Sequence, residues 1–352
     1  MTHHSIKEKI GQLFMIGFEG ATLSKNDPVA VDIVKRNLGG VVLFDTLLAK
    51  KSATNNIISP AQVADLTSTL QDLAAGNLLI AVDQEGGKVA RLKELHGFPA
   101  TPDAETLGWT GDSWDTTRCS HQVAKMLSSL GINFNLAPVV DLNVYRKNPI
   151  IGAYKRSFSS DPDVVFENTA AWIKAHSREG ILSCLKHFPG HGSSRNDSHL
   201  GFVDISTTWN EIELQPYRDF IAGGYKEAIM VGHLFNSRFD KSHPATLSYA
   251  TLNGILRRQL GHKGVIVSDD MQMRAITDRY GLADSCCRAI SAGVDLLIIG
   301  NNLCYDPHIL EKAQAEILRA LTDGKLTEER IEEAWSRIQH FKLLRKKKND
   351  PK

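Results

Sequence analysis

The sequence predicts an α/β protein with a single (β/α)8, TIM-like barrel, on the basis of three observations. The chain has 352 residues, of which 42% are hydrophobic, so it can bury one large core. Eight short, continuous apolar runs alternate with helix-like segments, as parallel strands buried on both faces do. Polar side chains directly follow several of these runs, where a barrel places its active site. An open doubly wound sheet is the alternative, but the count of eight strands favours the barrel.

The expected strands are apolar runs bounded by turn-forming residues, and the expected helices between them carry start and stop signals. Ser59 precedes Pro60 as an N-cap, and Asp161 precedes Pro162 in the same way. The expected strands are residues 13–18, 39–44, 78–82, 132–140, 181–185, 228–231, 264–267 and 295–299. The expected helices between them are residues 28–37, 60–75, 113–130, 162–178, 209–222, 252–260 and 283–292.

Two further helical stretches, 306–321 and 327–342, follow the last strand. We therefore expect one domain over residues 1–352, with the barrel at about 10–322 and a C-terminal helix and tail at about 327–352. The two longest loops, 47–58 and 92–109, are expected at the rim of the barrel.

Composition excludes several classes of partner. The formal net charge is +1, from 41 basic and 40 acidic residues, so no global field attracts nucleic acid or an acidic membrane. The five cysteines lack CxxC spacing and indicate a reducing compartment. The N-terminal apolar run is too short and interrupted for a signal peptide, and no stretch approaches about 18 apolar residues. We therefore expect a soluble cytoplasmic protein with no nucleic-acid or membrane partner.

Polar residues gather where the expected strands end, and parallel strands bring these ends together. Alternation along the seventh strand places Asp269 on the same face as the valines at 265 and 267. This predicts that Asp269, rather than Asp270, points into the barrel. The strand-end residues are Asp83, Asp141, Lys186, His187, His233, Asp269 and Asn301.

Several of the candidate residues also have a purely structural interpretation. Asp141 and Asp270 could each be the N-cap of the next helix. His233 could be a packed, hydrogen-bonded core histidine. Arg91 and Arg156 could be plain surface residues.

The run KHFPGHGSSRNDSH, residues 186–199, is rich in polar chemistry. His187, His191 and His199 offer metal ligands together with Asp197, but the absence of HxxxH or CxxC spacing disfavours a metal site. An Asp-x-His pair can instead orient an imidazole for proton transfer. On this interpretation His199 carries the proton and Asp197 orients it.

The conjunction of KHFPGHG and DSH with VDQEGG upstream, RSF between and SDDMQM downstream resembles glycoside hydrolase family 3. More narrowly, it resembles the single-domain β-N-acetylglucosaminidase, or β-N-acetylhexosaminidase, branch. The resemblance covers the chain from about residue 10 to the last strand. It implies a retaining exo-enzyme without a cofactor that hydrolyses terminal β-linked N-acetylglucosamine through a covalent glycosyl-aspartate. Cell-wall-derived muropeptides or related oligosaccharides are the implied substrates.

The resemblance also implies residue roles. Asp269 is the implied nucleophile, in agreement with the alternation, and His199 is the implied general acid/base with Asp197 as its partner. The chain departs from the family pattern I-G-x-R-S-F, because IGAYKRSF is two residues longer before the arginine. Serines also follow GHG, where many members have an acidic and a short polar residue. The implied substrate-binding residues are Asp83, Arg91, Arg156, Lys186 and His187.

Other functions stay open at this point. Within the family, a β-glucosidase is an alternative, although its acid/base usually lies on a second domain. A phosphorylase is another, because an imidazole does not repel an anionic acceptor as a carboxylate would. From other classes, a metal-dependent barrel hydrolase and a catalytically silent sugar-binding barrel are alternatives.

Overall fold

The structure, a computed structural model, describes residues 4–109, 113–198 and 200–346. Eight parallel strands close into a barrel in the order β1-β12-β11-β9-β7-β6-β3-β2. This confirms the predicted fold class, and all eight expected strands are present. The barrel strands are β1 (Phe14–Gly17), β2 (Gly40–Val42), β3 (Leu79–Val82), β6 (Phe134–Asn135), β7 (Leu182–Phe188), β9 (Ala228–Val231), β11 (Ile266–Asp270) and β12 (Leu296–Ile299).

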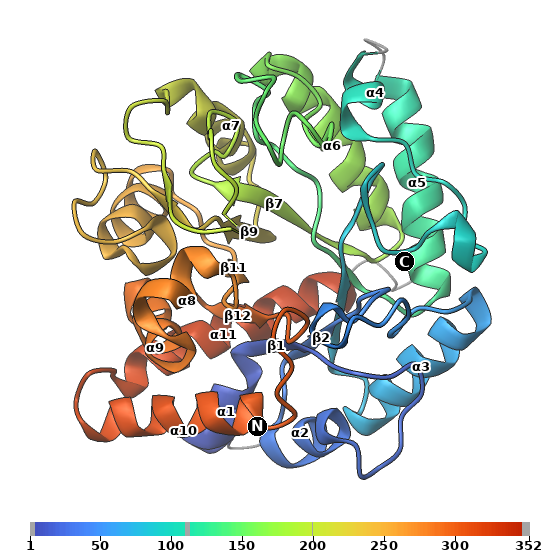
Figure 1. Cartoon of the computed structure of the whole chain (residues 1–352), viewed down its shortest axis with the longest axis vertical. Coiled ribbons are helices and arrows are strands. Elements are labelled where there is room, and N and C mark those ends of the chain that lie inside the picture. The colour runs from blue at the N-terminus through green and yellow to red at the C-terminus, as the bar shows by residue number, and fades with distance from the viewer. Residues whose placement is uncertain (1–3, 110–112, 199, 347–352) are drawn as a thin grey trace.

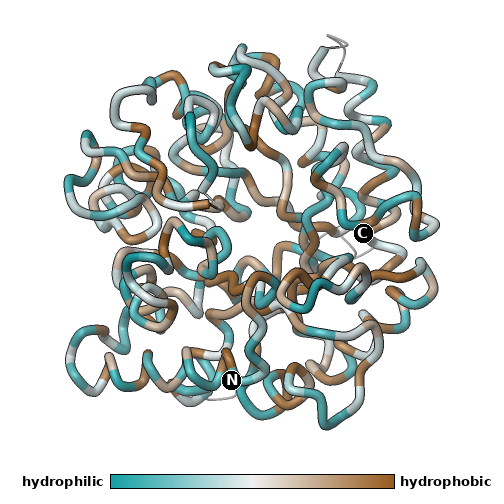
Figure 2. The backbone as a smooth tube through the Cα atoms, viewed as in Figure 1, coloured by the Kyte–Doolittle hydropathy of each residue, from teal (hydrophilic) through white to brown (hydrophobic). Residues whose placement is uncertain are grey.

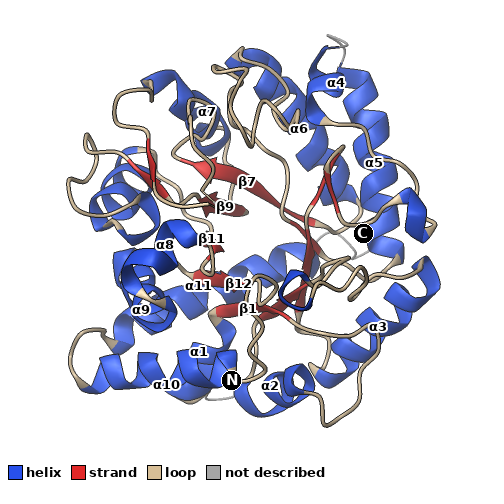
Figure 3. Cartoon of the chain, in the orientation of Figure 1, coloured by secondary structure: helices blue, strands red, loops and turns tan. Residues whose placement is uncertain are grey.

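Helices surround the barrel strands (Figures 1 and 3). A π-helical segment, Ala250–Gln259, replaces an α-helix between β9 and β11. The α-helices of the described chain are α1 (Ile6–Gln12), α2 (Pro28–Arg36), α3 (Pro60–Leu73), α4 (Ala104–Trp109), α5 (Ser113–Ser129), α6 (Pro162–Arg178), α7 (Gln215–Ala222), α8 (Arg274–Tyr280), α9 (Leu282–Ala292), α10 (Ile309–Thr322) and α11 (Glu328–Lys346).

Helix α3 illustrates how the sequence fixes these elements. The Ser59 hydroxyl accepts a hydrogen bond from the Gln62 amide at 3.3 Å, as expected for an N-cap. Val63, Leu66 and Leu70 recur at helical spacing and are all buried. Full burial of each such side chain contributes about 1.5–3 kcal/mol, so the helix is held by this apolar face. The same division runs through the molecule, with hydrophobic residues along the central strands and hydrophilic residues mostly on the outer loops (Figure 2).

Helix α11 closes the amino-terminal end of the barrel. Its Phe341 packs edge-on against Phe134 of β6, with ring centroids 5.2 Å apart. Lys342 is buried beside it and donates to Gln12 Oε1 at 2.8 Å and to the Asn77 carbonyl at 2.7 Å. Burial lowers the pKa of Lys342 to about 7. Access to the barrel interior is therefore left to the carboxyl ends of the strands.

Two differences from the sequence prediction concern strand lengths. Strand β7 continues to Phe188, so Lys186 and His187 belong to the strand instead of following it. The fourth strand is much shorter than residues 132–140, because Pro138 has no N–H to donate to a neighbouring strand.

Two small sheets at the carboxyl-terminal rim were not predicted. They pair β4 (Gln84–Gly86) with β5 (Val89–Ala90), and β8 (Val203–Asp204) with β10 (Leu234–Phe235). The expected helix 209–222 is also divided, since it begins as a 3-10 turn at Glu211–Leu214 before α7.

In the part of the chain that the structure describes, we find no helix with the length and apolar character needed to cross a membrane.

Candidate active site

A cavity of about 310 Å³ lies at the carboxyl ends of the barrel strands. This volume is at the lower end of the range of about 300–1,000 Å³ that is typical of small-molecule sites. The predicted site residues that line it come from β3, β7, β11 and the loops between them: Asp83, Arg91, Arg156, Lys186, His187 and Asp269.

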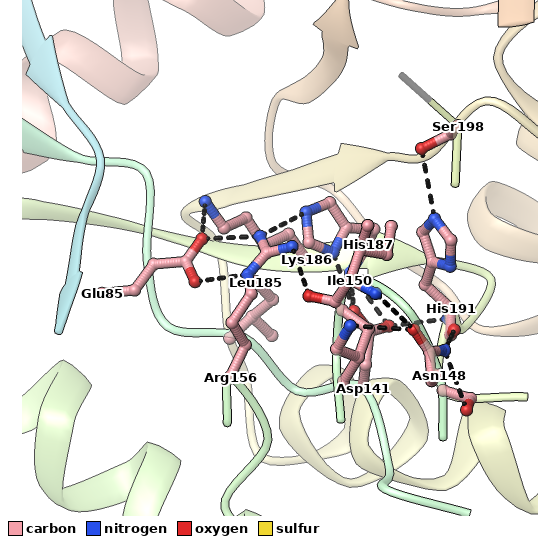
Figure 4. A network of polar contacts seen from close by, with 12 residues as sticks. Glu85, Asp141, Asn148, Ile150, Arg156, Leu185, Lys186, His187, His191 and Ser198 are labelled. Atoms are coloured by element: carbon pink, nitrogen blue, oxygen red, sulfur yellow. Dashed lines mark hydrogen bonds and ion pairs between the residues drawn. The ribbon is translucent and has the colours of Figure 1, made fainter. Parts of the chain in front are cut away.

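Glu85, which lines this cavity, belongs to a charged network, in which Figure 4 shows it joined to Arg156 and Lys186. The Arg156 guanidinium donates to both of its oxygens, from Nε to Oε2 at 2.7 Å and from Nη2 to Oε1 at 2.8 Å. Lys186 Nζ lies 2.6 Å from Glu85 Oε1 and 2.8 Å from Asp83 Oδ1. The four side chains therefore form one continuous set of ion pairs with fixed geometry.

These contacts keep the network ionised although it is buried. Burial opposes the charge on Glu85, but Arg156 and Lys186 hold its pKa well below the usual value. Lys186 and Arg91 lower the pKa of Asp83 against the same effect of burial. Burial likewise opposes the charge on Lys186, yet Asp83 and Glu85 raise its pKa. The cavity wall thus presents fixed charges of both signs at neutral pH.

Asp141 orients His187 within the network. His187 Nδ1 donates to Asp141 Oδ2 at 2.7 Å, and Arg156 Nη2 lies 3.2 Å from Nε2. Because an arginine nitrogen can only donate, Nε2 is the acceptor and the proton sits on Nδ1. Burial opposes the charge on Asp141, but His187 and the amide of His191 hold its pKa below the usual value. Asp141 is therefore not a helix N-cap, and the N-cap alternative is wrong.

The two arginines face the cavity, so the surface alternative is wrong for both. Arg156 is only 9% exposed. Arg91 Nη2 lies 3.5 Å from Asp83 Oδ2, and its guanidinium lies over the Phe44 ring at 5.5 Å from the centroid. Both arginines also line the cavity.

Asp269 and Asp270 both line the cavity, because the ladder between β11 and β12 shifts register at this point. The Asp270 carboxylate accepts the amides of Gln272 at 3.0 Å and Gly300 at 2.9 Å, which ties it to the backbone. It is not the N-cap of α8, since Met273 holds that position. Asp269 Oδ1 accepts the amide of Asp270 at 2.8 Å. Backbone amides therefore orient both carboxylates at the cavity wall.

His233 and Asn301 have structural contacts. His233 is buried, and it donates from Nε2 to the Asp270 carbonyl at 3.0 Å, while Nδ1 lies 2.8 Å from Thr246 Oγ1. The interpretation as a packed, hydrogen-bonded histidine is thus confirmed, and this histidine supports the β11 bulge. Asn301 exchanges hydrogen bonds with the backbone of Asp306 and does not line the cavity.

The structure describes only one residue of the predicted acid/base pair. Asp197 is half-buried, whereas His199 lies outside the described residues. Its neighbour Ser198 lines the cavity, as does His191. Within residues 4–109, 113–198 and 200–346, no group of three or more His, Cys, Asp or Glu side chains is arranged to hold a metal ion.

Glu85 is a site residue that sequence reasoning missed, whereas Asp141 was placed among the strand-end residues but given no role in the site. Glu85 shares the strand parity of Asp83, and that signal could have revealed it. For Asp141, the next helix begins only at Pro162, which already argued against an N-cap role.

The chain matches known proteins over almost its whole length. The model of the glycosyl hydrolase family 3 N-terminal domain matches residues 5–341. Beta-hexosaminidase A of Pseudoalteromonas piscicida is 33% identical over 348 residues, which cover 92% of this chain but 56% of that protein. The beta-hexosaminidase of Tolumonas auensis is 34% identical over 312 residues, covering 86% of each chain.

Solved structures agree with these matches. A glycoside hydrolase family 3 β-N-acetylglucosaminidase from Paenibacillus superposes with a TM-score of 0.88 at 32% identity, over 99% of this chain and 64% of that one. The β-N-acetylhexosaminidase of Beutenbergia cavernae gives a TM-score of 0.84 at 28% identity, over 97% and 99% of the two chains. The chain thus spans only 56% of the length of the Pseudoalteromonas protein and 64% of that of the Paenibacillus chain. The match over residues 5–341, together with these identities, shows that the chain belongs to glycosyl hydrolase family 3.

Proposed function

We propose that this protein is a retaining exo-β-N-acetylglucosaminidase. The observation that carries the proposal is a cavity of about 310 Å³, in which a network of ionised side chains lies near the strand that carries Asp269. Both curated relatives described above are named beta-hexosaminidases. Of the two solved structures, the Paenibacillus protein is a family 3 β-N-acetylglucosaminidase and the Beutenbergia protein is a β-N-acetylhexosaminidase.

The binding network suits a pyranose ring. Each sugar hydroxyl can donate one hydrogen bond and accept others, so it needs both kinds of partner. Asp83 supplies acceptors, while Arg91, Arg156 and Lys186 supply donors, and the ion pairs hold all four in place before the sugar arrives. His187, oriented by Asp141, adds a further polar contact.

The chemistry is a double displacement. Asp269 attacks the anomeric carbon and forms a glycosyl-aspartate, while the glycosidic C–O bond breaks and His199 protonates the departing oxygen. Water then attacks the same carbon, His199 takes its proton, and the Asp269 carboxylate is released. Asp197 orients the imidazole of His199 in both steps.

The substrate source follows from the resemblance and not from residue chemistry. We propose terminal N-acetylglucosamine residues of muropeptides or related oligosaccharides, cleaved in the cytoplasm during peptidoglycan recycling. The balanced charge of the chain is consistent with a free glycan as substrate instead of a charged polymer or membrane surface.

A panel of chromogenic β-glycosides tests the function. We expect release from the N-acetylglucosaminide to exceed release from the glucoside by orders of magnitude, with the N-acetylgalactosaminide as the third arm. Reactions with and without phosphate, analysed for sugar 1-phosphate, separate a hydrolase from a phosphorylase. Binding of N-acetylglucosamine without turnover, or activity lost on chelation and restored by zinc, would contradict the proposal.

A further inference from the structure

The loop of residues 189–198 is anchored firmly at its beginning. His191 donates its amide to Asp141 Oδ1 at 2.8 Å. Asn148 Nδ2 donates to the carbonyl oxygens of His191 and Gly192 at 2.7 and 3.1 Å. The Leu142 carbonyl lies 1.7 Å from where a Cβ of Gly192 would stand, so only glycine fits there. This part of the loop is fixed by well-formed hydrogen bonds and by backbone packing.

The far part of the loop, which carries Ser198, has longer contacts. Ser198 Oγ lies 3.3 Å from His191 Nε2, and the Ser198 carbonyl accepts the amide of Ala275 at 3.4 Å. Both distances are at the long end of hydrogen-bond geometry. Figure 4 shows the His191 ring reaching from the anchored part of the loop towards Ser198. Among the described residues, Ser198 is therefore held by long contacts of both its side chain and its backbone.

The His191 ring is suited to hold that position. It is 1% exposed, and burial lowers its pKa to about 4, so it is neutral at pH 7. Among the described residues its Nδ1 atom has no hydrogen-bond partner. A buried N–H without an acceptor is rarer than a buried lone pair without a donor, so the proton sits on Nε2 and is donated to Ser198 Oγ.

We propose that His191 is a positioning residue that sets the placement of the acid/base segment through its hydrogen bond to Ser198. This inference rests on the proposed function, because Ser198 is next in the chain to His199, the proposed acid/base. His191 links the two parts of the loop, because its backbone amide is bound to Asp141 and its ring contacts Ser198. Its proposed role is thus to hold Ser198 in place rather than to exchange protons itself.

The proposal predicts a particular kinetic signature. A misplaced acid/base slows cleavage most for substrates whose leaving group needs protonation, and least for those that leave unassisted. We expect Ser198→Ala and His191→Ala to lower kcat/KM roughly tenfold for a poorly departing alkyl N-acetyl-β-glucosaminide. For the dinitrophenyl glycoside we expect a change of less than about threefold. Substituting both residues together should cost little more than substituting either one.

Two further variants make the test specific. Ser194→Ala is the matched control, because Ser194 is buried in the same loop and its Oγ has no hydrogen-bond partner in the described chain. It should leave both substrates unaffected. His191→Gln keeps a side-chain N–H and should retain more activity than His191→Ala. Thermal unfolding of each variant shows that it is folded under the assay conditions.

The outcomes separate this inference from the proposed function. Equal losses on both substrates, or losses in His191→Ala alone, would mean that His191 contacts the sugar or supports the fold, and would overturn the inference. If His199→Ala shows the leaving-group dependence and Ser198→Ala does not, only the inference fails. If His199→Ala itself lacks that dependence, the acid/base assignment fails and the inference fails with it.

Discussion

Glu85 and Glu213 are buried to a similar degree, with 6% and 1% of their surfaces exposed. Their pKa values are nevertheless shifted in opposite directions. Burial opposes the charge on Glu85, but Arg156 and Lys186 hold its pKa well below the usual value. Burial raises the pKa of Glu213 to about 7. Its carboxylate accepts the amides of Ser193 and Asn210, at 3.2 and 3.3 Å, but these hydrogen bonds offset the effect of burial only in part. The two cations thus compensate the burial of Glu85 more fully than the two amides compensate that of Glu213.

The two glutamates with these different pKa shifts belong to parts of the site with different proposed roles. Glu85 belongs to the network proposed to hold the sugar, whose charges are fixed in advance by ion pairs. Glu213 belongs to the anchor of the loop proposed to carry the acid/base, which it joins to the 3-10 turn before α7. The ion pairs proposed to hold the sugar therefore keep their charges near neutral pH, whereas the contacts of Glu213 with the loop change there.

The largest expected effect comes from breaking the ion-pair network. Glu85→Ala leaves Arg156 and Lys186 buried with fewer compensating charges, and loss of one partner of a buried pair costs about 3–5 kcal/mol. We expect urea unfolding to show a loss of this size, together with loss of N-acetylglucosamine binding by calorimetry. Glu105→Ala is the control, because Glu105 is half-exposed and lies 3.9 Å from Lys155. A loss no larger than the control's would contradict the role of Glu85.

A smaller, pH-dependent effect is expected at the loop anchor. The pKa of Glu213 is raised from 4.5 to about 7 in the folded state, so its contribution to stability is present below pH 4.5 and is lost as the pH rises through 7. Between pH 5 and pH 8 this amounts to about 2 kcal/mol. Glu213→Gln should remove that part of the pH dependence of the unfolding free energy. Glu211→Gln, at an exposed ion pair with Arg218, should keep it, and identical profiles for Glu213→Gln and the parent protein would refute the assignment.

Asp141 touches both regions, because it accepts from the His187 ring and from the His191 amide. Asp141→Asn keeps the shape but removes the charge that these donors face. A hydrogen bond to a charged group contributes roughly 1.5–3 kcal/mol, so we expect KM for the N-acetylglucosaminide to rise about tenfold or more. Steady-state kinetics should place the change mainly in KM. A fall in kcat with KM unaltered would instead assign Asp141 to the loop alone.

The sequence predicted the fold because its signals are local. Apolar runs, N-caps such as Ser59 and the polar residues after each strand all depend on neighbours in the chain. Strand parity also predicted that Asp269 faces the cavity, and its position at a strand end did the same for Asp83. The barrel could therefore be predicted in outline, apart from strand lengths near Pro138 and at the end of β7.

The contacts within the site could not be predicted in the same way, because they join distant segments. Arg156 meets Glu85 across 71 residues, and Asn148 meets His191 across 43. The bulge that brings Asp270 to the cavity beside Asp269 also breaks the simple alternation. Such features depend on how the loops pack above the barrel, for which a single sequence carries no periodic signal.

Trapping of the glycosyl-enzyme tests whether Asp269 is the nucleophile. Incubation with a fluorinated N-acetylglucosaminyl fluoride slows release of the intermediate, and mass spectrometry of the digested protein locates the attached sugar. We expect one sugar on Asp269, and a natural product that is released with the β configuration. A sugar on Asp270, or a product first formed with the α configuration, would contradict it.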